Sequence, residues 1–243
     1  MIWRILFNSF VADIKFVRRD PMLFMAMLAP ILIIFLIRLV FPVISDFVLS
    51  KTGFQLDSYY TIVTLTILPV IPMLFGIVYA FILLDENDTH ILQVIAVTPA
   101  GKKNFLYMRM IAPLFFSFLL VLISIIVTDP VPTEGWLRTT FISLMLSLQA
   151  PFIFLFIGCL AGNKVEGMAF SKLYGVFLIA VPLGLILHHP WNYLAFFSPL
   201  YWISWAWITA NPVESLIYGG ISMIITLGGI ILLLQHFLKK HVD

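Results

Sequence analysis

The sequence predicts an all-α integral membrane protein with six transmembrane helices, an N-terminal amphipathic interfacial helix and a re-entrant helical segment before the last span. Three observations lead to this fold class. Of the 243 residues, 62% are hydrophobic and 11% are charged, whereas roughly 45–50% of a soluble domain is apolar. Six apolar segments are long enough to cross a hydrocarbon core of about 30 Å. The 14 prolines and 13 glycines fall largely within or beside these segments, where membrane helices tolerate them.

The first 20 residues are expected to form an amphipathic helix on the cytoplasmic surface. Large apolar side chains recur at spacings of three and four residues, while basic residues fall on another face. Such a helix can lie in the headgroup layer, and Asp20 with Pro21 ends it before the first span. The alternative is a polar lead-in without a helix. The apolar face consists of Trp3, Phe7, Phe10, Ile14 and Val17.

The rest of the chain forms one bundle within a single transmembrane domain, 1–243. The bundle covers residues 22–234, and residues 235–243 form a short cytoplasmic tail. Span boundaries are expected to be correct to about two to four residues. The expected spans are Met22–Val40, Tyr59–Leu84, Phe105–Val127, Leu137–Gly162, Met168–Leu187 and Leu216–Leu234.

Lysine and arginine set the orientation, because they gather in the short cytoplasmic loops of membrane proteins. With both termini inside the cell, three of the 14 basic residues, Arg38, Lys51 and Arg138, face outward. The other 11 are then cytoplasmic, which predicts a multi-pass protein of the cell membrane with both termini inside.

One apolar stretch, Trp191–Ala210, could be a seventh span. Four of the six tryptophans lie in it, and tryptophan prefers the headgroup boundary to the bilayer centre. Pro199 also interrupts the stretch. We therefore expect a re-entrant or interfacial pair of short helices on the outer side, marked by Ser198, Pro199 and Trp202.

The sequence contains no recognisable catalytic motif. It lacks a phosphate-binding glycine loop, HExxH and GxSxG, so we expect no enzyme activity in this chain.

The span centres carry no ionisable side chain, which argues against a proton- or sodium-coupled carrier. Arg38 and Arg109 are interpreted as anchors near span ends. Adjacent His188 and His189 diverge on a helix, so no metal site is expected. The net charge of +2 gives no reason to expect a nucleic-acid partner.

A polar island, Leu83–Phe105, interrupts this apolar chain. The carboxylates Asp85, Glu86 and Asp88 suit the N-terminus of a short helix, and Pro99 would stop it. Apolar residues within the island show a helical spacing. A short amphipathic helix at the inner surface can lie on lipid or fill a groove on a cytoplasmic protein; a plain connector is the alternative.

At these residues the chain resembles the ABC-2 type permeases, the membrane subunits of bacterial ABC exporters. Members show an acid followed by an apolar stretch closing in Thr-Pro, here Glu86, "LQVIAVTP", Thr98 and Pro99. His90 stands where the family often has glycine. The order of elements also agrees, with "NKVEGMAFSK" in the second cytoplasmic loop and "FFSPLYW" before the last span, so the resemblance covers nearly the whole chain.

The resemblance implies a coupling helix that sits in a cleft of a separate ABC ATPase subunit, which binds ATP and Mg. It also implies a second permease, identical or paralogous, and export of a hydrophobic or amphipathic compound such as a drug, a peptide antibiotic or a lipid-like molecule. Rival classes are a membrane immunity or scaffold protein, the substrate-capture subunit of a vitamin importer, and an intramembrane enzyme. The coupling residues expected from the resemblance are Glu86, Ile91, Leu92, Ile95, Thr98 and Pro99.

Overall fold

The computed structural model describes residues 17–89, 101–128, 135–186 and 191–242, and the regular elements in these ranges are all helical. Six of the helices are long and apolar enough to cross a membrane, which confirms the expected all-α fold with six spans. Of the expected interfacial helix, residues 17–20 are described. Val17, which belongs to its expected apolar face, is buried, and Trp3, Phe7, Phe10 and Ile14 lie outside the described residues. The six helices are Pro21–Thr52, Leu56–Asp88, Phe105–Thr128, Trp136–Leu160, Lys164–Ile186 and Pro212–Lys239.

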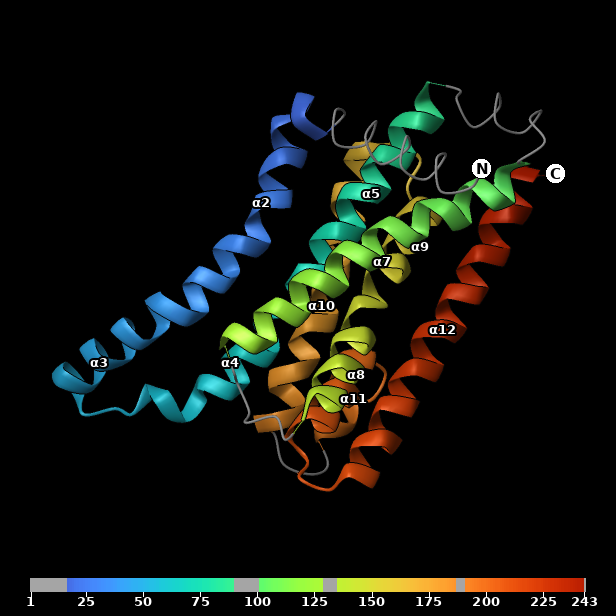
Figure 1. Ribbon diagram of the computed structural model, residues 1–243. Helices are drawn as coiled ribbons and strands as arrows, with labels where there is room; N and C mark the ends of the chain where they lie inside the picture. The colour runs from blue at the N-terminus through green and yellow to red at the C-terminus, as the bar shows by residue number, and fades with distance from the viewer. Residues whose placement is uncertain (1–16, 90–100, 129–134, 187–190, 243) are drawn as a thin grey trace.

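The spans alternate in direction, so helix ends far apart in the sequence meet at one end of the bundle (Figure 1). There α2 (Pro21–Phe35) begins, α5 (Val70–Asp88) ends, α10 (Lys164–Ile186) begins and α12 (Pro212–Val242) ends. We call this the basic end. Its described arginines and lysines include Arg18, Arg19, Arg109, Lys164 and Lys239.

The first span is longer than expected. We expected it to end at Val40, but the helix continues through a π-helical turn, η1 (Leu36–Val40), into α3 (Phe41–Thr52). The π turn lies directly before Pro42, which has no backbone N–H to donate to the helix. In this turn the N–H of Phe41 donates to the carbonyl of Leu36, five residues earlier, so the helix continues past the proline. Arg38, expected near the outer end, therefore lies near the middle of this helix.

The α2–α3 helix leans away from the other spans in Figure 1, where α3 is far from the rest of the bundle. α2 packs on α5 and α7 (Gly101–Thr128), whereas α3 packs on η1 and on η2 (Leu56–Tyr59). The ring of Phe41 meets Tyr60 edge-on, with centroids 5.3 Å apart, and α4 (Tyr60–Ile67) then returns the chain to the bundle.

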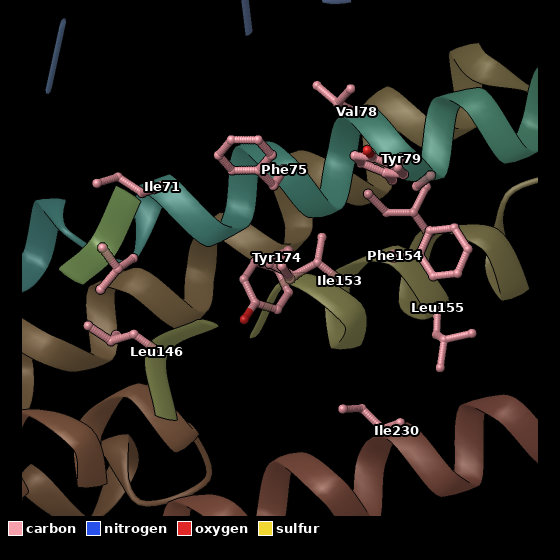
Figure 2. Close-up of a cluster of buried hydrophobic side chains, with 14 of the residues drawn as sticks. Ile71, Phe75, Val78, Tyr79, Leu146, Ile153, Phe154, Leu155, Tyr174 and Ile230 are labelled. Atoms are coloured by element: carbon pink, nitrogen blue, oxygen red, sulfur yellow. The ribbon is translucent and has the colours of Figure 1, made fainter. Parts of the chain in front are cut away.

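The second and fourth spans form the centre of the bundle. Their apolar windows are 72% and 78% buried, against 17–28% for the other four, whose faces can meet lipid. Figure 2 shows side chains of this centre, including Phe75 from α5, Ile153 from α9 (Gln149–Leu160) and Ile230 from α12. Gly76 lets the helices approach: a Cβ there would lie 2.7 Å from the carbonyl oxygen of Ala150.

The fourth span is broken at Leu148, between α8 (Trp136–Ser147) and α9. Pro151 cannot donate to the carbonyl of Ser147 four residues earlier. That carbonyl accepts instead from the hydroxyl of Ser117 at 3.4 Å, a contact from α7 (Gly101–Thr128). A neighbouring span thus satisfies the backbone group that the proline frees, as apolar surroundings require.

Beside this break, the amide of Gln149 joins three spans. Its nitrogen donates to the hydroxyl of Thr226 on α12 at 2.9 Å, and its oxygen accepts from the hydroxyl of Tyr174 on α10, also at 2.9 Å. All three side chains are at most 1% exposed. Since an unpaired polar group is costly there, each partner stabilises the burial of the others.

Two short helices, η3 (Trp191–Ala195) and α11 (Pro199–Ile208), lie between α10 and α12. With 10 residues, α11 is about 15 Å long, half of the hydrocarbon thickness, so it is not a seventh span. Pro199 occupies its first turn, where a missing N–H costs nothing. The hydroxyl of Ser198 donates to the carbonyl of Phe177 at 3.2 Å, and the Trp202 indole donates to Phe196 at 2.9 Å.

Arg138 on α8 holds the other end of α11. Its guanidinium donates to the carbonyls of Ala206 and Trp207 at 3.3 and 2.7 Å, and to that of Thr209. A cation at the C-terminus of a helix also meets the negative end of its dipole. The short helix is therefore fixed at both ends to spans on either side.

Candidate functional site

The most concentrated charge in the described chain lies at the basic end, where α5 leaves the bundle. We expected Asp85, Glu86 and Asp88 to open a short helix; this is wrong, because all three lie in the last turns of α5. The second span simply continues past its apolar residues. Carboxylates at a helix C-terminus face the negative end of the dipole, so cations from neighbouring helices must compensate for them.

The first compensating cation is Arg109 on α7. Its guanidinium is ion-paired and hydrogen-bonded with the carboxylate of Glu86. The two side chains are 10% and 15% exposed, so water screens the pair weakly. The guanidinium also lies 5.4 Å from the ring centroid of Phe105, one turn earlier on α7. Glu86 thus fastens the end of the second span to the start of the third.

The second compensating cation is Lys164, the first residue of α10. Its ammonium nitrogen lies 2.7 Å from a carboxylate oxygen of Asp85 and 3.1 Å from one of Asp20. Asp20 precedes α2, so one lysine connects three spans that are distant in sequence. The three side chains are 24–29% exposed, which places the cluster at the boundary between water and the packed bundle.

Asp20, one of the two carboxylates that contact Lys164, is also anchored in its own helix. Asp20 is the N-cap of α2: its second carboxylate oxygen accepts from the backbone N–H of Met22 at 2.9 Å and of Leu23 at 3.4 Å. Burial raises the pKa of Asp20, but the hydrogen bonds from Lys164 and these two amides outweigh it and lower the pKa below its usual value of 3.8. Asp20 is therefore ionised at neutral pH.

The start of α10 is held by a capping box. The backbone N–H of Glu166 donates to the side chain of Asn163 at 3.0 Å, and the Glu166 carboxylate accepts from the backbone N–H of Gly162 at 2.7 Å. The turn between α9 and α10 consists of three residues, 161–163. Lys164 is thus presented from a short, closed turn.

The remaining expected site residues lie either outside the described part of the chain or away from the charged cluster. Ile91, Leu92, Ile95, Thr98 and Pro99 lie outside the described residues, so the expected coupling helix stays a prediction. Ser198, Pro199 and Trp202 belong to the short helices at the opposite end of the bundle. Glu86, the one expected coupling residue within the described ranges, does take part, through a contact within the chain.

Sequence reasoning missed the roles of Asp20, Asp85, Arg109 and Lys164. We read Asp20 as a helix stop, Arg109 as an interfacial anchor and Lys164 as a topology signal. The available signal was position: acids at the end of one span and bases at the start of the next antiparallel spans must share one boundary layer. No spacing rule identifies which acid meets which base.

Comparisons with known proteins place this bundle in a family. Residues 13–234 match the family described as "Fluoroquinolones export permease protein Rv2686c-like". Two relatives from Mycobacterium tuberculosis, the fluoroquinolones export permease proteins MT2760 of strain CDC 1551 / Oshkosh and Rv2686c of strain H37Rv, are each 26% identical over 208 residues. The alignment covers 82% of this chain and 80% of each relative. No solved structure matches the chain.

The matched region extends from before the first span to the last turns of the sixth, so it includes the whole helical bundle and its charged cluster. An export permease is what the resemblance to ABC-2 permeases led us to expect, and the match is consistent with it. The chain is a multi-pass membrane protein that belongs to the Rv2686c-like fluoroquinolones export permease family.

Proposed function

We propose that this chain is the membrane subunit of an ATP-driven, ABC-2 type exporter that moves a hydrophobic or amphipathic drug out of the cell. ATP and Mg are bound by a separate ABC ATPase subunit, and a second permease, identical or paralogous, completes the complex. The family match over residues 13–234 is the observation that carries this proposal. The basic end then faces the cytoplasm, because it gathers the arginines and lysines.

The ATPase docks where α5 leaves the bundle. Residues Ile91, Leu92, Ile95, Thr98 and Pro99 follow the charged last turns of α5 and supply the contact. Glu86 has a different task from the one that the sequence suggested, since its carboxylate is occupied by Arg109. It braces the end of α5 against α7, so that force applied beyond residue 89 reaches two spans.

A fluoroquinolone is the first substrate to test, because the two relatives are named for fluoroquinolones export. These drugs are amphipathic compounds with a flat ring system. Spans with large apolar exposed faces suit the passage of such a compound from the inner leaflet, and a charged anchor is not required.

The test is co-expression with an ABC ATPase encoded beside this chain, in a bacterium that lacks its main efflux pumps. Exporting cells accumulate less of a fluorescent fluoroquinolone than cells carrying an ATPase that cannot hydrolyse ATP. Co-purification of the ATPase with unchanged accumulation would favour an immunity or scaffold protein. A vitamin retained through purification would favour an importer subunit.

A further inference from the structure

The lysine cluster, Asp20, Asp85 and Lys164, connects α2 to α10, two helices that otherwise have little contact with each other. α2 packs on α5 and α7, whereas α10 packs on α4, α5, α9 and α11. Lys164 reaches directly from the start of α10 to the residue that caps α2. The same ammonium also holds Asp85 in the last turns of α5.

The cluster joins structured helix ends and not loose loops. The two carboxylate oxygens of Asp20 are divided between α2 and Lys164, so the cap and the bridge form together. The carbonyl of Asp85 accepts from the backbone N–H of Thr89 at 3.0 Å, which closes the end of α5. Lys164 follows the capping box of α10. A displacement of one helix end is therefore passed to the other two.

Stability alone is a weak reason for this arrangement. Partly exposed ion pairs contribute little to stability, because water screens them and their side chains lose freedom. The geometry, in contrast, is specific: one cation is shared by two helix ends, at the point where α5 continues toward the expected coupling segment. Directly beside it, Glu86 attaches the same turn of α5 to α7. The end of α5 is thus tied to three other spans by two consecutive carboxylates.

We infer that Lys164 is a positioning residue of the export cycle, which holds the starts of α2 and α10 to the end of α5 so that the three move as one unit. This inference rests on the proposed function, because the motion is the one that a docked ATPase imposes on α5. Its consequence is that the first, second and fifth spans receive the motion together at the basic end.

The functional test uses the full permease with its ATPase and three variants. Lys164→Met removes both bridges and keeps the length of the side chain, Lys164→Arg keeps the charge, and Lys172→Met is the control. Lys172 is an exposed lysine on the same helix, outside the cluster. We expect Lys164→Met to lower fluoroquinolone export roughly fivefold, the lower range of coupling between sites, at unchanged ATP hydrolysis. Lys164→Arg restores export, and Lys172→Met leaves it unchanged.

The second measurement is the distance between the starts of α2 and α10, with and without ATP. If Lys164 had only a structural role, its substitution would not make this distance depend on ATP. Spin labels are placed at exposed Arg19 and Val165, beside Asp20 and Lys164, in a Cys159→Ala background. In the otherwise unaltered complex, the distance between the labels stays the same with and without ATP. In Lys164→Met it broadens or changes when ATP binds. If Lys164→Met fails to reach the membrane, Asp20→Asn, which retains the N-cap, replaces it with the same expectations.

The inference is overturned if Lys164→Met exports as well as the unaltered protein, or if the distance between the labels changes with ATP before any substitution. These results differ from a failure of the proposed function. In that case the unaltered permease with its ATPase shows no export at all.

Discussion

The hydroxyl of Tyr174 on α10 donates a 2.9 Å hydrogen bond to the amide oxygen of Gln149 on α9. The amide nitrogen of Gln149 in turn donates to Thr226 on α12, so the side chain has a partner on each side. Polar groups buried between apolar helices specify which helices meet and in which register.

A double-mutant cycle between Gln149 and Thr226 should therefore show coupling. We expect Gln149→Leu and Thr226→Val each to destabilise the protein, and the pair to be coupled by about 0.6 kcal/mol, typical of hydrogen bonds between membrane helices. The measurement is unfolding in mixed detergent micelles. Additive effects of the two substitutions would show that the hydrogen bond contributes nothing.

Close packing of α5 on α9 predicts a severe effect at Gly76. A methyl group there would overlap the carbonyl oxygen of Ala150 and the Cβ of Ile153, which lies 2.8 Å away. The backbone cannot yield locally, so Gly76→Ala should cost about 1–3 kcal/mol, as overpacking does elsewhere. Thermal unfolding in detergent measures the loss.

Gly228→Ala is the matched control for Gly76→Ala, because a Cβ at Gly228 meets no atom within 4 Å. It lies within α12, where alanine has the higher helix propensity, so we expect a neutral or slightly stabilising effect. Equal losses in the two variants would contradict close packing at Gly76.

The ion pair of Asp20 predicts a stability difference that depends on pH. The folded-state pKa of Asp20 is lowered, so its stabilising contribution is present above 3.8 and is lost as the pH falls through the folded-state value. Asp20→Asn keeps an N-cap and removes the charge. Because the group is partly exposed, we expect a loss of at most about 1 kcal/mol at pH 7.

Unfolding of the two proteins between pH 7 and pH 3 checks this, since the unaltered protein should approach Asp20→Asn as Asp20 takes up a proton. A difference that stays constant over the whole range would assign the effect of the substitution to something other than the charge.

Reversal of the Glu86 and Arg109 charges tests the brace between α5 and α7. Either single reversal, Glu86→Arg or Arg109→Glu, places like charges together in a weakly exposed site. We expect each to lower stability by about 2 kcal/mol or more, as loss of a buried partner does. The combined reversal should recover part of the loss. No recovery in thermal unfolding would mean that the pair contributes no attraction of its own.

Orientation can be measured with single cysteines in a Cys159→Ala background. Thr89→Cys, at the end of α5, should react with a membrane-impermeant maleimide only after the cells are permeabilised. Gln55→Cys, in the exposed turn after α3, should react in intact cells. Reaction of Thr89→Cys in intact cells would place the basic end outside and would overturn the proposed docking site.

The sequence predicts the bundle well, because burial in lipid imposes long apolar segments that composition alone reveals. The predictions from sequence are wrong at particular positions. We expected the first span to end at Val40, yet a π turn carries the helix on past Pro42. Asp85 and Glu86 suggested a helix start, although lysine and arginine from other spans allow them to end one. Rules based on neighbouring residues cannot predict which distant cation neutralises a carboxylate, because partners such as Lys164 and Asp20 are 144 residues apart.

The turn that closes α9 onto α10 has a practical consequence for handling this protein. The turn has three residues and is tied to the start of α10 by the Asn163 and Glu166 contacts, so it is too short and too constrained for an inserted epitope or protease site. The exposed stretch around Gly53, whose positive φ of 73° suits a glycine turn, is the better place for such an insertion. A reporter inserted there leaves the charged end of the bundle intact.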